Sequence, residues 1–326
     1  MKKILLAIVS SILASCGGGG SSDPAPQALT KSVQVSQSIV SAPVTPAIFE
    51  ECISPFVVKT KDQSFQQLSE TQKSFSFTKA FSDKKFFITP AIWNHDNLDI
   101  TIEMEGCVKG DVATAKYNFN VECCKGNSHA SPYIAYGWDD QLFAFVNSLF
   151  YYMGGDYKPA SKLPVRFDNL PKKLTIDYDV EVSNEKGYYH LTTGLWAYAL
   201  KPDRTWDCCF KPQPMDIHYW GTPEMKKNHP TNYDKVFTDY QGKTWGLRRD
   251  KYWDCDGKCN AYDYTIIIDL FSGQLKDKID IVPVLNMLLD LGWIKSNYGL
   301  KNINIGTEIV NGNATVNIKK FTVLDT

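Results

Sequence analysis

Three residue types that can take part in chemistry alternate along one short segment. Asp216, His218 and Trp220 occupy every second position between residues 216 and 220, and in a β-strand such positions lie on one face. A carboxyl group can act as a nucleophile or exchange protons. An imidazole titrates near neutral pH, and an indole offers a flat apolar surface. The segment therefore predicts one face that combines an acid, a base and an aromatic platform.

The elements that must hold such a face are predicted to be β-strands. Apolar and polar residues alternate with a period of two in several runs, and turn-forming Pro, Gly and Asn residues separate them. These runs are residues 86–88, 98–104, 173–180 and 315–318, and a denser apolar run at 264–270 is typical of a buried strand.

One segment has helical spacing instead. Between Ile281 and Trp293 the apolar residues recur every three to four positions. Asp280 is placed to cap the start, Pro283 falls in the first turn, and Gly292 can end the helix. The whole pattern predicts an all-β sandwich with one helix packed on it.

The first residues predict export. Two lysines and a short apolar run end in Leu-Ala-Ser-Cys at Cys16, which resembles the cleavage box of bacterial lipoproteins. Residues 1–15 would then be the signal peptide, and 16–47 a lipid-anchored Gly/Ser- and Pro-containing linker before a domain at 48–326. By this resemblance we expect a lipid anchor at the bacterial cell envelope, at the outer membrane or cell surface. The alternative is an ordinary signal peptide with a chance cysteine.

Eight cysteines remain besides Cys16. An even number in an exported chain favours disulfides, although zinc binding is the alternative, and connectivity cannot be deduced from sequence. They are Cys52, Cys107, Cys123, Cys124, Cys208, Cys209, Cys255 and Cys259.

Composition excludes some functions. With 35 basic and 36 acidic residues in 326, the formal charge of −1 does not suit binding of nucleic acid by bulk charge. The sequence contains no G-x-S-x-G elbow, Walker loop, dinucleotide fingerprint or H-E-x-x-H. We therefore expect no cofactor, no metal and no nucleic-acid partner.

The C-terminal region resembles glycoside hydrolase family 12, the endo-β-1,4-glucanases and xyloglucanases. The similar segments are 286–294 (NMLLDLGWI), 298–300 (YGL) and 305–312 (IGTEIVNG), with shorter matches at 131–138 (SPYIAYGW), 163–165 (LPV) and 92–94 (IWN). The resemblance spans about residues 85–323. It implies a two-sheet jelly roll of the concanavalin type with the helix on the convex side. It also implies retaining, endo-acting hydrolysis of a β-1,4-linked glucan by a monomer.

The family pattern also implies roles for particular residues. Glu308 of Gly-Thr-Glu would be the general acid/base, and Asp216 would stand at the nucleophile position, where the family has Glu. Gly194 stands where a supporting Asp is expected. Trp93, Trp138, His218 and Trp220 would contact the glucan. As the acid, Glu308 would need a raised pKa.

Simpler interpretations exist for each of these residues. Glu308 could be a surface residue, Asp216 a turn acid and His218 a core histidine, and the tryptophans fit the core equally well. The two departures from the family pattern favour a rival function, a non-catalytic glycan-binding lipoprotein. A structural surface protein without a sugar ligand is a third possibility.

Overall fold

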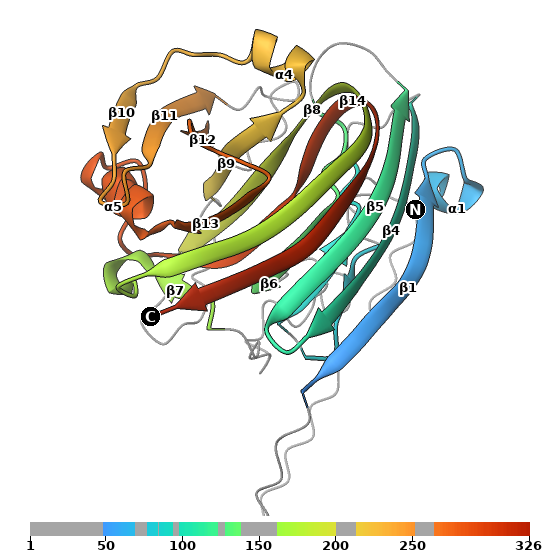
Figure 1. The fold of residues 1–326 in the computed structure, drawn as a ribbon, viewed down its shortest axis with the longest axis horizontal. Coiled ribbons are helices and arrows are strands. Elements are labelled where there is room, and N and C mark those ends of the chain that lie inside the picture. Colours follow the sequence, from blue (N-terminus) through green and yellow to red (C-terminus); the bar gives the residue numbers. More distant parts are fainter. Residues whose placement is uncertain are drawn as a thin grey trace, which may run out of the picture. The chain divides into compact units, whose positions relative to one another are not determined.

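The longest strands in the described part of the chain are β8 (Leu174–Ala199) and β14 (Tyr298–Asp325), which pair antiparallel along almost their whole length (Figure 1). The computed structural model describes residues 48–68, 77–83, 85–93, 98–122, 128–137, 162–199, 213–251 and 264–326. These two strands organise the fold because each takes part in both of its layers.

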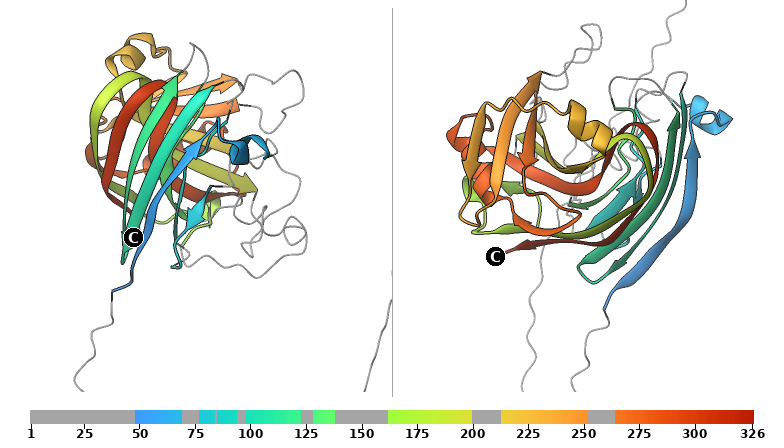
Figure 2. Two further views of the ribbon diagram at one scale, coloured as in Figure 1. Left: turned by 90° about the vertical axis from the view of Figure 1, so that its right-hand side faces the viewer. Right: turned by 45° about the horizontal axis from the view of Figure 1, so that its top comes forward.

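Both strands change layer near the point where Gly187 of β8 faces Gly312 of β14. Their φ angles are +105° and +116°, in the region that residues with a Cβ rarely adopt. A Cβ on Gly312 would lie 2.0 Å from the carbonyl oxygen of Lys186. Glycine is therefore required at this bend, and Figure 2 shows the two strands curving together from one layer into the other.

The first layer is antiparallel and ends in the two long strands. Its order is β1 (Glu50–Lys59), β4 (Asp99–Lys109), β5 (Val112–Glu122), residues 312–325 of β14, residues 174–187 of β8, and β13 (Lys276–Asp280).

The second layer continues from the other halves of the same strands. Its order is β2 (Lys79–Ala80), β3 (Phe86–Thr89), β6 (Tyr133–Gly137), residues 298–309 of β14, residues 189–199 of β8, β9 (Gln213–Gly221), β12 (Tyr264–Leu270), β11 (Thr244–Lys251) and β10 (Lys235–Thr238). Only the β9–β12 pair is parallel in the described sheet. Because β8 and β14 are continuous, the predicted two-sheet jelly roll is present as one strongly bent sheet.

The hydrophobic core lies between the two layers. The ring of Tyr178, in the first layer, stacks on that of Tyr219, in the second, with 4.9 Å between centroids. The hydroxyl of Tyr117 on β5 donates to Thr307 Oγ1 on β14 at 3.2 Å. Contacts between the facing sides of two sheets are the defining feature of a sandwich, so the predicted fold class is confirmed.

The predicted late helix is also confirmed. Helix α5 (Val282–Asp290) buries Val284, Leu285 and Leu288 in the core, and its chain leaves through Gly292 at φ +67°. Asp280 accepts the Val282 N–H at 3.1 Å, which satisfies one of the unpaired donors of the first turn.

The structure adds short elements that periodicity did not predict, so the expectation of a single helix was incomplete. They are α1 (Gln63–Gln66), α4 (Pro223–Asn228), a 3-10 helix (Phe167–Asn169) and the two-residue strand β7 (Val165–Arg166). No helix among the described residues is long and apolar enough to cross a membrane.

One disulfide joins Cys52 of β1 to Cys107 of β4, which are direct partners in the ladder. This agrees with the expectation that the chain uses disulfides. The other seven cysteines, Cys16 included, lie outside the described residues.

Candidate active site

The side chains that alternate away from the core on β14, β8 and β9 form a second surface, which we call the site face. Three ladder positions define it: Glu308 faces His190, His218 faces Thr192, and Asp216 faces Gly194. The sequence-based expectation that Asp216 and His218 share a face agrees with this register. The site face consists of Asn304, Gly306 and Glu308 of β14, His190, Thr192 and Gly194 of β8, Asp216 and His218 of β9, and Asp269 of β12.

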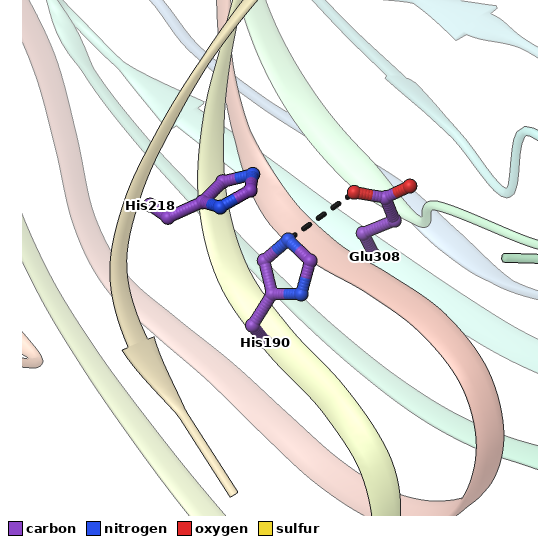
Figure 3. Close-up of side chains that lie close together, drawn as sticks. All are labelled: His190, His218 and Glu308. Carbon is purple, nitrogen blue, oxygen red and sulfur yellow. Dashed lines mark ion pairs between the residues drawn. The ribbon is translucent and has the colours of Figure 1, made fainter. Parts of the chain in front are cut away.

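Glu308 has a polar partner on each oxygen. Ser128 Oγ donates to Oε1 at 2.6 Å, and His190 Nε2 lies 3.2 Å from Oε2 (Figure 3). Burial alone would raise the pKa of Glu308, but His190, His218 and the Ser128 hydroxyl together hold that pKa below its usual range. The sequence-based expectation for Glu308 was a raised pKa, and the difference arises from these three neighbours.

Asp216 has the opposite environment. It is half-buried, and no residue in the described ranges forms a hydrogen bond or an ion pair with its carboxyl group. Burial and the nearby charge of Glu308 raise the pKa of Asp216 to about 8. The two carboxyls therefore share one proton near neutral pH, held on Asp216 in the free site.

Two histidines whose rings are tilted by 54° to each other lie between Glu308 and Asp269 on the site face. The rings of His190 and His218 are 4.2 Å apart, and the two residues are only 6% and 9% exposed. Burial and the neighbouring His190 lower the pKa of His218 to about 4, in spite of Asp269. His218 is therefore neutral near pH 7.

Asp269 joins the histidines to a basic group on β11. Its Oδ1 lies 3.3 Å from His218 Nδ1 and 2.9 Å from His229 Nε2, and Arg248 Nη1 donates to Oδ2 at 3.0 Å. Burial opposes ionisation of Asp269, yet contacts with the two histidines keep its pKa below the ordinary value. A polar row thus crosses five neighbouring strands, from Glu308 on β14 to Arg248 on β11.

Helix α4 brings His229 to this row. Thr222 caps the helix by accepting the Met225 N–H at 3.2 Å, and Pro223 occupies the first turn. His229 follows directly after the helix as its C-cap residue. The segment that connects β9 to β10 therefore contributes a side chain to the row.

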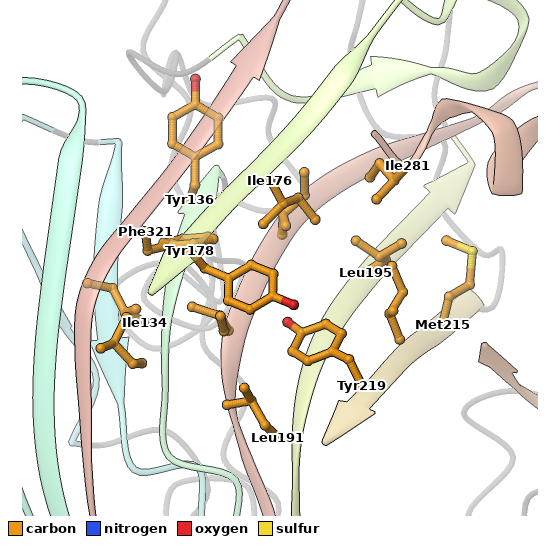
Figure 4. Packing of buried hydrophobic residues seen from close by; sticks show 14 of the residues in the cluster. Ile134, Tyr136, Ile176, Tyr178, Leu191, Leu195, Met215, Tyr219, Ile281 and Phe321 are labelled. Carbon is orange, nitrogen blue, oxygen red and sulfur yellow. The ribbon is translucent and has the colours of Figure 1, made fainter. Parts of the chain in front are cut away.

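Trp220 departs from the alternation that the sequence predicts. The ladder pairs Leu191 with Trp220 but Thr192 with His218, so Tyr219 is an extra residue in a β-bulge. Leu191 and Tyr219 point into the core (Figure 4). Trp220 is the ladder partner of Leu191. The centroid of its ring lies 6.0 Å from that of buried Tyr189. The bulge turns Trp220 towards the core side, away from Asp216 and His218.

The other two tryptophans predicted to contact the glucan are Trp93 and Trp138. Trp93 is half-buried, and its backbone N–H donates to the His129 backbone carbonyl at 2.8 Å. The bridges Ile92–Ala130 and Ala130–Ile309 place their residues on the core side, so Trp93 lies on the side of Glu308. Trp138 lies outside the described residues.

The structure identifies site residues that the sequence analysis missed. His190 is four positions before Gly194 on the same strand, so period two would have placed it on the same face. Asp269 is a single acid inside the apolar run 264–270, which is a signal for a buried partner. Ser128 and His229 come from connecting segments, where no periodicity could indicate their positions.

The structure was compared with known proteins, and the likeness that results is one of fold. No protein-family model and no curated protein matches the sequence. Solved structures do match: a family 12 xyloglucanase from Bacillus licheniformis is 16% identical with a TM-score of 0.59, covering 84% of this chain and 100% of its own.

Two endoglucanases show the same likeness. Endoglucanase 3 of Trichoderma harzianum, from family GH12, is 10% identical with a TM-score of 0.57, over 87% of this chain and 100% of its own. An endoglucanase from Rhodothermus marinus is 14% identical with a TM-score of 0.52, over 76% and 96%. The chain therefore has the jelly-roll fold of the family 12 glycoside hydrolases.

Proposed function

We propose that the protein is a divergent family 12 glycoside hydrolase that cleaves β-1,4-linked glucan within the chain. The observation that carries the proposal is the pair Asp216 and Glu308 on one face of this fold, close enough for the charge of one to raise the pKa of the other. The proteins with similar structures include a xyloglucanase and an endoglucanase.

The reaction needs one ionised and one protonated carboxyl. In the first step Asp216 attacks the anomeric carbon, the bond to the leaving sugar breaks, and Glu308 gives its proton to the leaving oxygen. In the second step Glu308 takes a proton from water, which attacks the glycosyl ester and frees Asp216. These roles require the shared proton to move from Asp216 to Glu308 before the first step.

A second candidate is a glycan-binding protein without hydrolytic activity. The observation that favours it is the content of the site face near Asp216, where Gly194 offers no side chain and the amide of Asn304 occupies the space above it. In addition, the neighbouring histidines and Ser128 lower the pKa of Glu308 and favour its ionised form. Such a protein would keep the glucan surface without a working acid.

One set of assays separates these functions. The release of reducing ends from cellulose, xyloglucan and mixed-linkage glucan is measured for the natural protein and for Asp216→Asn, and retardation in gels containing the same glucans is measured in parallel. Hydrolysis that disappears in Asp216→Asn supports the enzyme. Retardation without hydrolysis supports the binding protein. The absence of both hydrolysis and retardation supports a structural protein without a sugar ligand.

We further propose that Cys16 is lipidated and anchors the protein in the cell envelope of a bacterium, at the outer membrane or cell surface. The support is the Leu-Ala-Ser-Cys sequence after a short apolar run and the Gly/Ser-rich spacer that follows. Replacement of Cys16 by Ala is expected to reduce the amount of processed protein in the membrane fraction. Unchanged fractionation and unchanged detergent partitioning would exclude the anchor.

A further inference from the structure

His190 and His218 carry buried ring nitrogens whose hydrogen bonding is incomplete. Both residues are more than nine-tenths buried. His190 Nε2 and His218 Nδ1 lie 3.2 Å and 3.3 Å from carboxylate oxygens, whereas His190 Nδ1 and His218 Nε2 have no hydrogen-bond partner among the described residues. A buried polar atom without a partner is costly, and such atoms in native proteins usually indicate a bound water or ion. These nitrogens therefore indicate a ligand.

The arrangement of the three side chains in Figure 3 fits a metal ion. One nitrogen of His190, one of His218 and an oxygen of Glu308 all lie within 4.8 Å of one another. His190 Nε2 and Glu308 Oε2 are 3.2 Å apart. Zinc bonds of roughly 2.0–2.1 Å at tetrahedral angles place two ligand atoms about 3.3 Å apart. The nearest pair already has the spacing of two ligands on one ion.

We propose that His190, His218 and Glu308 bind one divalent transition-metal ion on the site face, with Zn²⁺ as the best match. Two imidazoles and one carboxylate form a ligand set that suits zinc, whereas Ca²⁺ and Mg²⁺ prefer oxygen ligands alone. Three protein ligands leave a fourth position for water or a sugar hydroxyl.

Neighbouring groups would orient these ligands. Asp269 Oδ1 lies 3.3 Å from His218 Nδ1, which leaves Nε2 of that ring for the ion. Ser128 Oγ holds Glu308 Oε1 at 2.6 Å, which leaves Oε2 for the ion. A carboxylate behind a histidine ligand and a hydrogen bond to a carboxylate ligand are usual second-layer contacts of zinc sites.

A second cluster, His218, His229 and Asp269, has similar spacing but fits a cation less well. Arg248 Nη1 lies 3.0 Å from Asp269 Oδ2 and 3.4 Å from His229 Nε2. The guanidinium already supplies the positive charge at this carboxylate, and a metal ion beside it would be repelled. Among the described residues, no Lys or Arg forms an ion pair with Glu308 of the first cluster, so the structure favours that cluster.

The proposal is independent of glucan hydrolysis and adds a consequence to it. An ion bound through Glu308 Oε2 occupies the oxygen that would receive or give the catalytic proton. Metal binding and general-acid catalysis by Glu308 therefore exclude each other. If the protein is a hydrolase, Zn²⁺ should inhibit it. If it only binds glucan, the ion still binds.

The test is a titration of the chelator-treated, oxidised protein with Zn²⁺ by calorimetry, and with Co²⁺ by visible absorption. We expect one ion per chain and a rise in the thermal unfolding temperature. His190→Ala and His218→Ala should each weaken binding by at least about 100-fold, since second-layer changes alone cost 10–100-fold. Circular dichroism verifies that both variants are folded.

His229→Ala is the matched control, because it removes a histidine of the second cluster and leaves all three proposed ligands. Binding that survives in this variant and is lost in His190→Ala supports the site. Binding lost in His229→Ala but kept in His190→Ala would overturn it, as would a cobalt–thiolate absorption band, which would place the ion on cysteines. An absence of binding by the natural protein at micromolar Zn²⁺ would overturn it too.

Discussion

The amide of Asn304 occupies the place where a side chain at Gly194 would stand. A Cβ on Gly194 would lie 2.5 Å from Asn304 Nδ2, and the Gly194 N–H donates to Asn304 Oδ1 at 3.0 Å. Gly194 is also the ladder partner of Asp216. Asn304 therefore fills the space that a side chain at position 194 would need beside the candidate nucleophile.

This relationship predicts a paired mutational effect. Gly194→Asp alone, which introduces the acid that the family resemblance implies at this position, should lower the free energy of unfolding by about 1–3 kcal/mol because the new side chain overlaps the amide. Gly194→Asp with Asn304→Ala should recover most of that loss. Urea unfolding of the two single variants and the double variant measures the coupling. Additive effects of the two changes would contradict the overlap.

The bend between the layers gives a second prediction. Gly312→Ala places a Cβ in the left-handed region, 2.0 Å from the Lys186 carbonyl oxygen, so we expect a loss of at least about 2 kcal/mol in the free energy of unfolding. Gly242→Ala is the control, since Gly242 has φ +77° and a Cβ there would meet no atom within 4 Å. It should cost about 1 kcal/mol. Equal losses would show that the bend does not depend on close contact.

The face of β9 shows how far the sequence alone could predict the site. Alternation gave the correct face for Asp216 and His218, because their segment follows the ladder. It failed for Trp220, because a bulge adds one residue and local sequence carries little signal for a bulge. Likewise, helix α5 followed from its spacing, whereas β8 and β14 were expected only as short runs. Their continuity depends on two facing glycines far apart in the sequence.

The length of the side chain at position 216 gives a third prediction. Asp216→Asn should reduce turnover of an unactivated glucan by roughly 10³-fold or more, because the nucleophile is removed. Asp216→Glu should raise turnover, by up to about 10²-fold, because the carboxyl moves towards the retaining separation. Asp179→Asn, at a carboxylate paired with Lys276 away from the site face, is the control and should have no effect. If neither the natural protein nor Asp216→Glu hydrolyses any glucan while both bind it, the binding function is correct.

The shared proton gives a fourth prediction, for protein kept in chelator. Asp216 has a pKa of about 8, so above that pH both carboxyls are ionised and no general acid remains. Turnover should fall above about pH 8 and depend on one proton. Stability supplies a check that needs no activity: a raised folded-state pKa means that stability declines as pH rises from the unfolded value of 3.8 towards 8. Asp216→Asn should therefore stabilise the fold more at pH 8 than at pH 4. Equal effects at both pH values would contradict the raised pKa.

The last prediction concerns Glu308 and its partner Ser128. Glu308→Gln removes the acid and should reduce turnover by about 10²–10⁴-fold, while retardation in glucan gels stays close to that of the natural protein. Ser128→Ala removes the 2.6 Å hydrogen bond to Oε1, which favours the ionised carboxyl, so the proton should shift towards Glu308 and turnover should change less than in Glu308→Gln. Glu181→Gln is the matched control, because Glu181 is an exposed carboxylate paired with Lys319, and it should leave turnover unchanged. Full activity of Glu308→Gln on an unactivated polysaccharide would show that another group protonates the leaving oxygen.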